Sequence, residues 1–193
     1  GISKNPESFS ADEFRIYFTD KDRGAVLRLS RDGITAVSDA GMKDFFSDNL
    51  KNATALIGGY DGRKDEYNLT IHSVNSPNDA KEVYTVSYSE KVKGWTSFKS
   101  FIPESGISLS GSYFTFKDGN LYKHYTPLLD GAEVDSELAN NYNSFYGINY
   151  NSKIISVMNN EPSIVKTFST INYESNKTDT APWICNDIET NIE

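Results

Sequence analysis

The sequence predicts an all-β fold, and three observations favour it. The 193 residues include 12 Tyr and 11 Phe, side chains that are common in strands, while the helix-forming residues Ala and Leu are few. Short stretches alternate between polar and apolar residues, and turn dipeptides separate these stretches. We expect antiparallel propeller-like blades or a meander with one short inserted helix, and a β-sandwich is the alternative.

The N-terminal part is predicted to form hairpins. Residues 15–20 and residues 25–30 are rich in strand-forming residues, and they flank a polar turn at residues 21–24 that ends in glycine. Two further hairpins are expected where Asp-Gly lies between such segments, at Asp32-Gly33 and at Asp118-Gly119. Asp-Gly accepts the positive φ angles that a type I′ turn requires, so we expect this turn type at both places.

One segment has the spacing of a helix. Four apolar residues at i, i+3, i+4 and i+8 would share one helical face: Met42, Phe45, Phe46 and Leu50. Ser38 or Asp39 precedes them and is expected to cap the helix, because short polar side chains accept hydrogen bonds from the first free N–H groups. The pattern predicts a short helix inserted between strands.

The middle of the chain is predicted to be a half-buried antiparallel meander. Residues 66–73 and 82–89 alternate between polar and apolar side chains, which is typical of strands with one solvent-exposed face. A turn at residues 90–94 follows, and then a strand at residues 95–101.

Parts of the sequence resemble one another. Residues 17–22 and residues 113–118 share the pattern Tyr-Phe-Thr-x-Lys-Asp, and residues 59–70 form a similar predicted hairpin between them. Repeats of about 40 to 50 residues with four strands each are typical of propeller blades. The repeats therefore favour a propeller over a sandwich.

We expect residues 1–193 to form a single β-rich domain that is a fragment of a longer protein, because the sequence starts at Gly1 and has no closing pattern. Residues 128–143 are acidic and are expected to form an exposed insertion loop. Residues 174–193 are expected to form a polar extension. The single Cys185 leaves no internal disulfide to stabilise the fold.

The charge balance excludes some functions. There are 19 Lys and Arg against 27 Asp and Glu, and the net charge is −8. A chain of this charge repels phosphates, so specific nucleic-acid binding is not expected. No apolar run approaches the roughly 20 residues that span a bilayer, so membrane insertion is not expected either.

No pattern indicates catalysis, a metal or a cofactor. His72 and His124 are far apart in the sequence and lack ligand spacing. The acidic turn at residues 20–24 resembles the start of a calcium loop, but its later ligands are missing, so turn capping is the better interpretation. Glu133, Asp135 and Glu137 could mimic glycosidase carboxylates, yet consecutive charges in a loop are usually just solvated. We expect a protein that is not an enzyme.

Aromatic side chains are the candidate contacts for a partner or a ligand. Four large aromatic residues are the candidates for such contacts: Trp95, Tyr142, Tyr146 and Trp183. With Tyr113, Tyr122 and Tyr125 they could form a platform that stacks on sugars. The favoured interpretation is that most of these rings fill the layers between strands, because each buries roughly 150 to 250 Å².

Several segments are similar to a known family. They are residues 12–30, 33–34, 38–42, 60–61, 64–70, 89–90, 94–104, 113–124, 145–147, 166–168 and 171–174. The most distinctive of them are residues 89–90 together with residues 94–104. This pattern resembles the propeller-like region of large virion structural proteins of tailed double-stranded DNA bacteriophages, some of which lie at the tail nozzle or muzzle. The similarity covers nearly the whole chain, although the loop at residues 128–143 is not a fixed part of the pattern.

The resemblance implies a non-enzymatic, tail-associated structural protein that binds other virion proteins and is made in the bacterial host cytoplasm. One alternative is a receptor- or glycan-binding module of the tail that contacts the host surface. A second is a virion-borne polysaccharide hydrolase. The net charge of −8 adds the hypothesis that acidic residues line a DNA exit channel, since a lining of like charge does not hold the passing polyanion.

Overall fold

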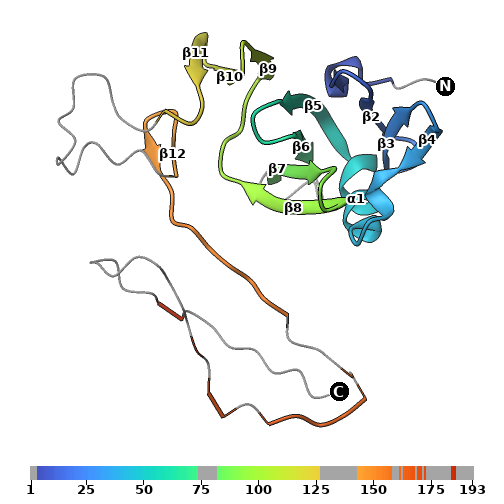
Figure 1. The fold of residues 1–193 in the computed structure, drawn as a ribbon, viewed down its shortest axis with the longest axis vertical. Coiled ribbons are helices and arrows are strands. Elements are labelled where there is room, and N and C mark those ends of the chain that lie inside the picture. The colour runs from blue at the N-terminus through green and yellow to red at the C-terminus, as the bar shows by residue number, and fades with distance from the viewer. Residues whose placement is uncertain are drawn as a thin grey trace. The chain divides into compact units, whose positions relative to one another are not determined.

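The computed structural model describes residues 4–73, 82–126 and 143–157, and residues 161, 163–167, 169–170, 172 and 184–185. Contacts between residues divide the chain into two units, Gly1–Lys153 and Ile154–Glu193. The described helices and strands all lie in the first unit (Figure 1). They are mostly antiparallel strands with one short α-helix, which confirms the all-β prediction with its inserted helix.

The strands of the first unit form three larger sheets. The first sheet contains β1 (Ser10–Ala11), β2 (Ile16–Asp20), β3 (Ala25–Ser30) and β4 (Gly33–Ala36). The second sheet contains β5 (Ala53–Asp61), β6 (Glu66–Ser73), β7 (Glu82–Ser89) and β8 (Gly94–Lys99). The third sheet contains β9 (Ser105–Leu109), β10 (Ser112–Lys117) and β11 (Asn120–Lys123). A ribbon of β12 (Ser144–Phe145) and β13 (Ile148–Asn149) follows, and each sheet connects neighbouring strands in chain order, as in the predicted meander.

The two Asp-Gly dipeptides make different turns. Lys117 pairs with Asn120, and both loop residues, Asp118 and Gly119, have positive φ angles of 50° and 75°. This is the predicted type I′ turn. In the earlier hairpin Ser30 pairs with Gly33, so the loop residues are at positions 31 and 32 and the positive φ of 101° falls on Gly33. The hairpin prediction is confirmed there, but the turn type is wrong, because the register places the glycine after the loop as in a G1 bulge.

The predicted helix is α1 (Lys43–Lys51). Phe46 and Leu50 are fully buried on its inner face, as the spacing predicts. The expected cap is wrong. The N-cap position is Met42, whereas Ser38 and Asp39 belong to the separate 3-10 helix η2 (Val37–Asp39). Another 3-10 helix, η1 (Pro6–Ser8), precedes β1.

The first sheet covers one face of the second sheet. The ring of Tyr17 in β2 stacks on Tyr67 at 4.9 Å and on Tyr60 at 5.9 Å between ring centroids. Tyr60 and Tyr67 are paired across β5 and β6, so they project from the same face. The buried residues Phe46 and Leu50 of α1 belong to the same apolar cluster, which forms the main core.

The third sheet covers the opposite face of the second sheet. Gly59 alternates with Tyr60 in β5, so its side-chain position lies on the other face, where a Cβ atom would be 2.5 Å from the Tyr113 Oη atom of β10. This face is polar. Ser87 donates to the Asn68 amide oxygen at 2.6 Å, and the hydroxyls of Thr70 and Thr85 are 2.8 Å apart. Cross-strand pairs of this kind satisfy polar groups that would be costly to bury alone.

The central strand β6 of the second sheet is therefore buried on both faces. Residues 67–71 of β6 are all buried, where the alternating pattern predicted one exposed face. That prediction is wrong for the centre of the sheet, because its polar side chains Asn68, Thr70 and Thr85 are buried, with Tyr113 of the third sheet against Gly59 and Asn68. The layered packing agrees with the sandwich alternative, and closure of the sheets into a propeller stays a prediction.

The repeated motif occupies equivalent positions in the two outer sheets. Tyr17 and Thr19 in β2 are buried and face the second sheet, and Tyr113 in β10 is buried and faces the same sheet from the other side. Because side chains alternate along a strand, the Phe between the Tyr and the Thr of each motif lies on the opposite side of its sheet. Phe18 is nevertheless buried, because the ring of Phe9 stacks on it at 5.0 Å between ring centroids, whereas Phe114 is only partly buried.

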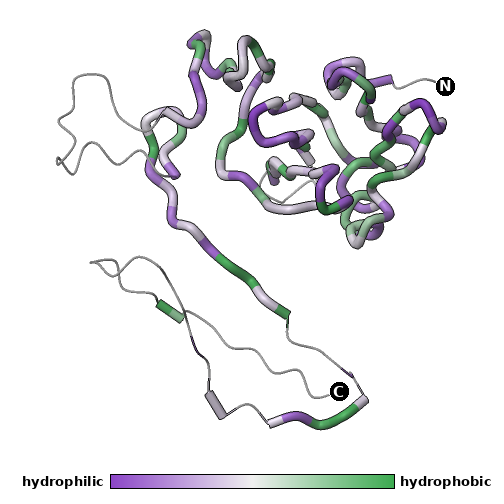
Figure 2. Tube along the Cα trace, in the orientation of Figure 1, coloured by the Kyte–Doolittle hydropathy of each residue, from purple (hydrophilic) through white to green (hydrophobic). Residues whose placement is uncertain are grey.

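The second unit contributes few described residues. Residues 151–157, at the boundary of the two units, have no regular secondary structure. They include the highly exposed Ile154, Ile155 and Val157. Figure 2 colours the described trace by hydropathy and shows hydrophobic stretches in both units. The acidic loop predicted at residues 128–143 lies outside the described residues except for Asn143, and the polar extension predicted at residues 174–193 lies outside them except for residues 184–185.

Candidate protein–protein interface

The outer surface of the first sheet carries a row of exposed aliphatic side chains. Leu29 of β3 pairs with Ile16 of β2 on one side and with Ile34 of β4 on the other. All three are exposed, and Ile34 is 65% exposed. Strand alternation directs them away from the second sheet, since their neighbour Tyr17 points toward it. We call Ile16, Leu29, Ile34 and the adjoining Phe14 the first outer face.

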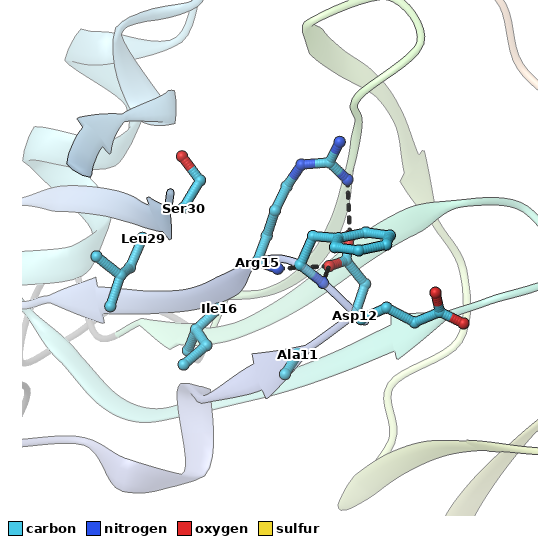
Figure 3. A pocket seen from close by; sticks show the side chains of 8 residues that line it. Ala11, Asp12, Arg15, Ile16, Leu29 and Ser30 are labelled. Carbon is cyan, nitrogen blue, oxygen red and sulfur yellow. Dashed lines mark hydrogen bonds and ion pairs between the residues drawn. The ribbon is translucent and has the colours of Figure 1, made fainter. Parts of the chain in front are cut away.

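A shallow depression adjoins this row. It has a volume of about 410 Å³ and is lined by residues 11–16, Leu29 and Ser30. Figure 3 shows Ile16 and Leu29 on one side of their strands, with Arg15 extending to the opposite side. Phe14 is 75% exposed at its edge. The Asp12 carboxylate accepts hydrogen bonds from the backbone N–H groups of Phe14 at 2.7 Å and Arg15 at 2.6 Å, so the loop that presents the ring is fixed.

The outer surface of the third sheet is also apolar. Phe116 of β10 pairs with Leu121 of β11, and Ile107 of β9 pairs with Phe114. Leu109 is 64% exposed and Leu121 is 58% exposed, and Ile107 and Phe116 are exposed as well. We call Ile107, Leu109, Phe116 and Leu121 the second outer face. Contiguous apolar patches of this kind mark interaction sites, whereas single exposed apolar residues do not.

A partly buried ionic cluster fixes the first sheet to the second. Glu90, directly after β7, accepts a hydrogen bond from Tyr17 Oη at 2.8 Å and two from Arg28 Nη1 at 2.8 and 3.0 Å. The Arg15 Nε atom is 3.9 Å from the same carboxylate. Burial, and then the hydrogen bond to Glu90, raise the pKa of Tyr17 well above its usual value. Sequence reasoning missed Glu90, because its partners are 62 and 73 residues away along the chain and no local pattern identifies them.

His124 is part of a buried aromatic cluster behind the third sheet. Its Nε2 atom is 2.8 Å from Thr115 Oγ1, which is also 2.9 Å from Tyr146 Oη. The imidazole packs against Phe101 and Tyr113 with ring centroids 4.8 and 5.1 Å away. Desolvation by burial lowers the pKa of His124 to about 4. This histidine is a neutral core residue.

We expect the protein to lose stability between neutral pH and pH 5 because of His124. The unfolded chain takes up a proton at this side chain near pH 6.5, whereas the folded protein does so only near pH 4, so a fall in pH favours unfolding. The free energy of unfolding should drop by about 2 kcal/mol from pH 7.5 to pH 5.0 through this group. Urea unfolding of the native chain and of the His124→Gln variant at both pH values measures it. An equal drop in both proteins would show that His124 does not carry the effect.

The four aromatic residues that the sequence offers as candidate contacts differ in their structural environment. Trp95 is partly buried on the apolar face of the second sheet, where its indole N–H donates to the Val37 carbonyl at 3.0 Å and its ring packs on Phe46 at 4.5 Å. Tyr146 packs edgewise on Tyr122 at 4.8 Å, and burial raises the pKa of Tyr146. The other two candidates, Tyr142 and Trp183, lie outside the described residues.

The acidic motifs that fall on described residues serve the local structure. Asp20 Oδ1 accepts a hydrogen bond from the Arg23 backbone N–H at 3.2 Å, and Asp22 pairs with Lys4 at 2.9 Å, which agrees with turn capping rather than a calcium loop. Glu133, Asp135 and Glu137 lie outside the described residues. In the part of the chain that the structure describes, no group of three or more His, Cys, Asp or Glu side chains could hold a metal ion. No helix in that part is both long and apolar enough to cross a membrane.

The described part of the chain is an all-β protein with two exposed apolar faces, and apolar patches of this kind mark interaction sites. Comparison with known families then gives the family. Residues 1–119 match the Crassvirus muzzle protein, and residues 140–193 match the Crassvirus muzzle protein C-terminal domain. The chain belongs to the Crassvirus muzzle protein family, a family of phage virion structural proteins. A search of curated proteins gave no match.

Proposed function

We propose that this chain is a non-enzymatic structural component of the phage tail, at its nozzle or muzzle, and that it acts by binding other virion proteins. One observation carries the proposal: exposed aliphatic and aromatic side chains gather on the first and second outer faces. Folding alone does not explain these exposed side chains, because both outer sheets already bury their inner faces. Contact with another protein explains them.

The composition of the two faces suits binding. An exposed aromatic ring beside a depression offers apolar area to a partner, and Phe14 is such a ring. Contact between two such faces would remove apolar area from water at a gain of roughly 25 cal/mol per Å². The inner layers hold the faces in place, through the Tyr17 stack on one side and the Tyr113 contact on the other. A rigid scaffold of this kind loses little entropy on binding.

Membership of the muzzle family supports a location in the virion. The position of the chain on the tail can be tested by immunogold labelling of the particles. Gold-conjugated antibodies raised against this chain should label one end of the tail in electron micrographs of intact particles. Antibodies that were first adsorbed with the purified chain provide the control. Label on the capsid would contradict the tail position. Absence of the chain from purified virions by mass spectrometry would contradict the structural role itself.

A further inference from the structure

We propose that the third sheet and the β12–β13 ribbon form an acid-sensitive flap, which detaches and unfolds while the first and second sheets stay folded. We call residues 105–126 and 143–150, which contain β9 to β13, the flap. The inference goes beyond the proposed function, because contact with other virion proteins needs no layer that opens. The second outer face lies on the flap, so opening removes that face and leaves the first outer face intact.

The flap has an apolar cluster that is separate from the main core. The main core joins α1 to the first and second sheets, and its members all lie within residues 17–95. Phe101 and Tyr113 lie outside it and are buried as well, with 2% and 1% of their surface exposed. Phe101 packs on His124 and Phe145 with ring centroids 4.8 and 5.3 Å away. Two separate clusters allow two separate unfolding steps.

Hydroxyl groups join the flap to the second sheet. Ser108 of β9 donates a hydrogen bond to the Tyr60 carbonyl and accepts one from the Gly62 backbone N–H, both at 2.8 Å. The side chains of Tyr113 and Asn68 share a further hydrogen bond. Water can replace such bonds when the flap opens, so each contributes little net free energy. Separation at this junction therefore costs less than separation of the apolar main core.

Two tyrosines in the flap have a strained backbone. Tyr125 and Tyr146 have positive φ angles of 60° and 55°, a region that bulky residues avoid. The Tyr125 hydroxyl donates to the Asp61 carboxylate of β5, and the Tyr146 hydroxyl lies 2.9 Å from Thr115 Oγ1. These hydrogen bonds hold the strained backbone while the flap is closed. Unfolding of the flap releases the strain, which favours the open state.

His124 makes the opening sensitive to acid. The titratable groups around its ring are Asp61 of β5, Tyr113 of β10, and Tyr125 and Tyr146 of the flap. Burial disfavours the imidazolium ion and outweighs the attraction of the Asp61 carboxylate, so the pKa of His124 falls to about 4. When the flap unfolds, water reaches the ring, which then takes up a proton at about pH 6.5. A fall in pH therefore favours the open flap.

Hydrogen exchange of the full 193-residue chain at pH 7.5 and pH 5.0 tests the proposal. The intrinsic rate of an unstructured amide at the same pH, divided by the measured rate, gives a protection factor. The amides of β10 and β11 should be about tenfold or more less protected than those of β6 and β7 at both pH values. Protection in the flap should also fall roughly 30-fold from pH 7.5 to pH 5.0. Equal protection in the flap and in the second sheet would overturn the proposal.

The two histidines of the chain provide a variant and its matched control. His124→Gln removes the imidazole, so the fall in flap protection between the two pH values should shrink to less than about threefold. His72→Gln alters β6 of the second sheet, which stays folded when the flap opens, and should keep the full pH response. A full response in His124→Gln would overturn the proposal, because acid would then act through another group.

A variant in the main core tests whether the flap opens separately, and it does not depend on the folding of His124→Gln. Ile71→Val removes one carbon atom from a fully buried side chain of β6. Protection of β6 and β7 should fall about fivefold. Protection of the flap should stay the same, because the closed and open states share the defect. An equal fall in both would overturn the proposal, since the flap would then open only with the whole chain. The immunogold test concerns intact particles and is independent of these results.

Discussion

Replacement of Glu90 with alanine should lower the free energy of unfolding by about 3 kcal/mol. The substitution removes the acceptor of the Arg28 guanidinium and of the Tyr17 hydroxyl, and the side chains of Glu90 and Arg28 are only 10% and 20% exposed. An arginine left without its partner at a site of such low exposure is costly, since the little water that reaches it replaces the carboxylate only in part. Urea unfolding of the variant and of the native chain measures the loss.

Two further variants distinguish the loss of stability caused by breaking this ion cluster from the effect of any substitution in the turn. Lys91→Ala alters the exposed next residue and should change the free energy of unfolding by less than about 0.5 kcal/mol. The double variant Glu90→Ala with Arg28→Ala should lose less than the sum of the single variants, because removal of both charges leaves neither one unpaired. Equal losses for Glu90→Ala and Lys91→Ala would contradict the assigned role.

Gly58→Ala should have the second largest effect, also about 3 kcal/mol, at the upper end of the usual cost of overpacking. A Cβ atom at this position would lie 2.1 Å from the Ser8 carbonyl oxygen and 2.7 Å from its carbonyl carbon. The same oxygen accepts the hydrogen bond of the buried Tyr67 hydroxyl at 2.7 Å. Backbone cannot rotate aside as a flexible side chain can, so η1 must move away from β5 and this bond must weaken.

Gly62→Ala is the matched control. A Cβ atom there would meet Ser108 Oγ at 3.6 Å, an ordinary van der Waals contact. We expect its unfolding midpoint in urea to lie close to that of the native chain, while the midpoint of Gly58→Ala falls clearly. Similar midpoints for the two variants would show that η1 yields without cost and would refute the overpacking argument.

Local patterns predicted the strands well. The predicted bounds of β6 and β7, residues 66–73 and 82–89, are those of the structure, because alternation and turn residues act over a few positions. The contacts between layers were not predictable in this way. Gly59 fits against Tyr113 only because a later sheet folds back onto β5, and no local pattern encodes this return. The half-buried prediction for β6 failed for the same reason.

The candidate interface was also beyond local patterns. Tryptophan and tyrosine were singled out because they are large and often mediate binding, yet Trp95 contributes to the core and Tyr146 packs on Tyr122. The exposed residues Ile34 and Leu121 have the same apolar character as buried strand residues. The sequence of a strand does not reveal whether a further layer covers it, so these residues were identified only from the packed sheets.

The burial of β6 on both faces has an evolutionary consequence. A strand with one solvent-exposed face can accept polar exchanges at every second position, but residues 67–71 of β6 have no such freedom, because all five are buried. Substitutions should therefore be tolerated mainly in the outer layers and the turns, and the two outer faces could change independently of the central layer.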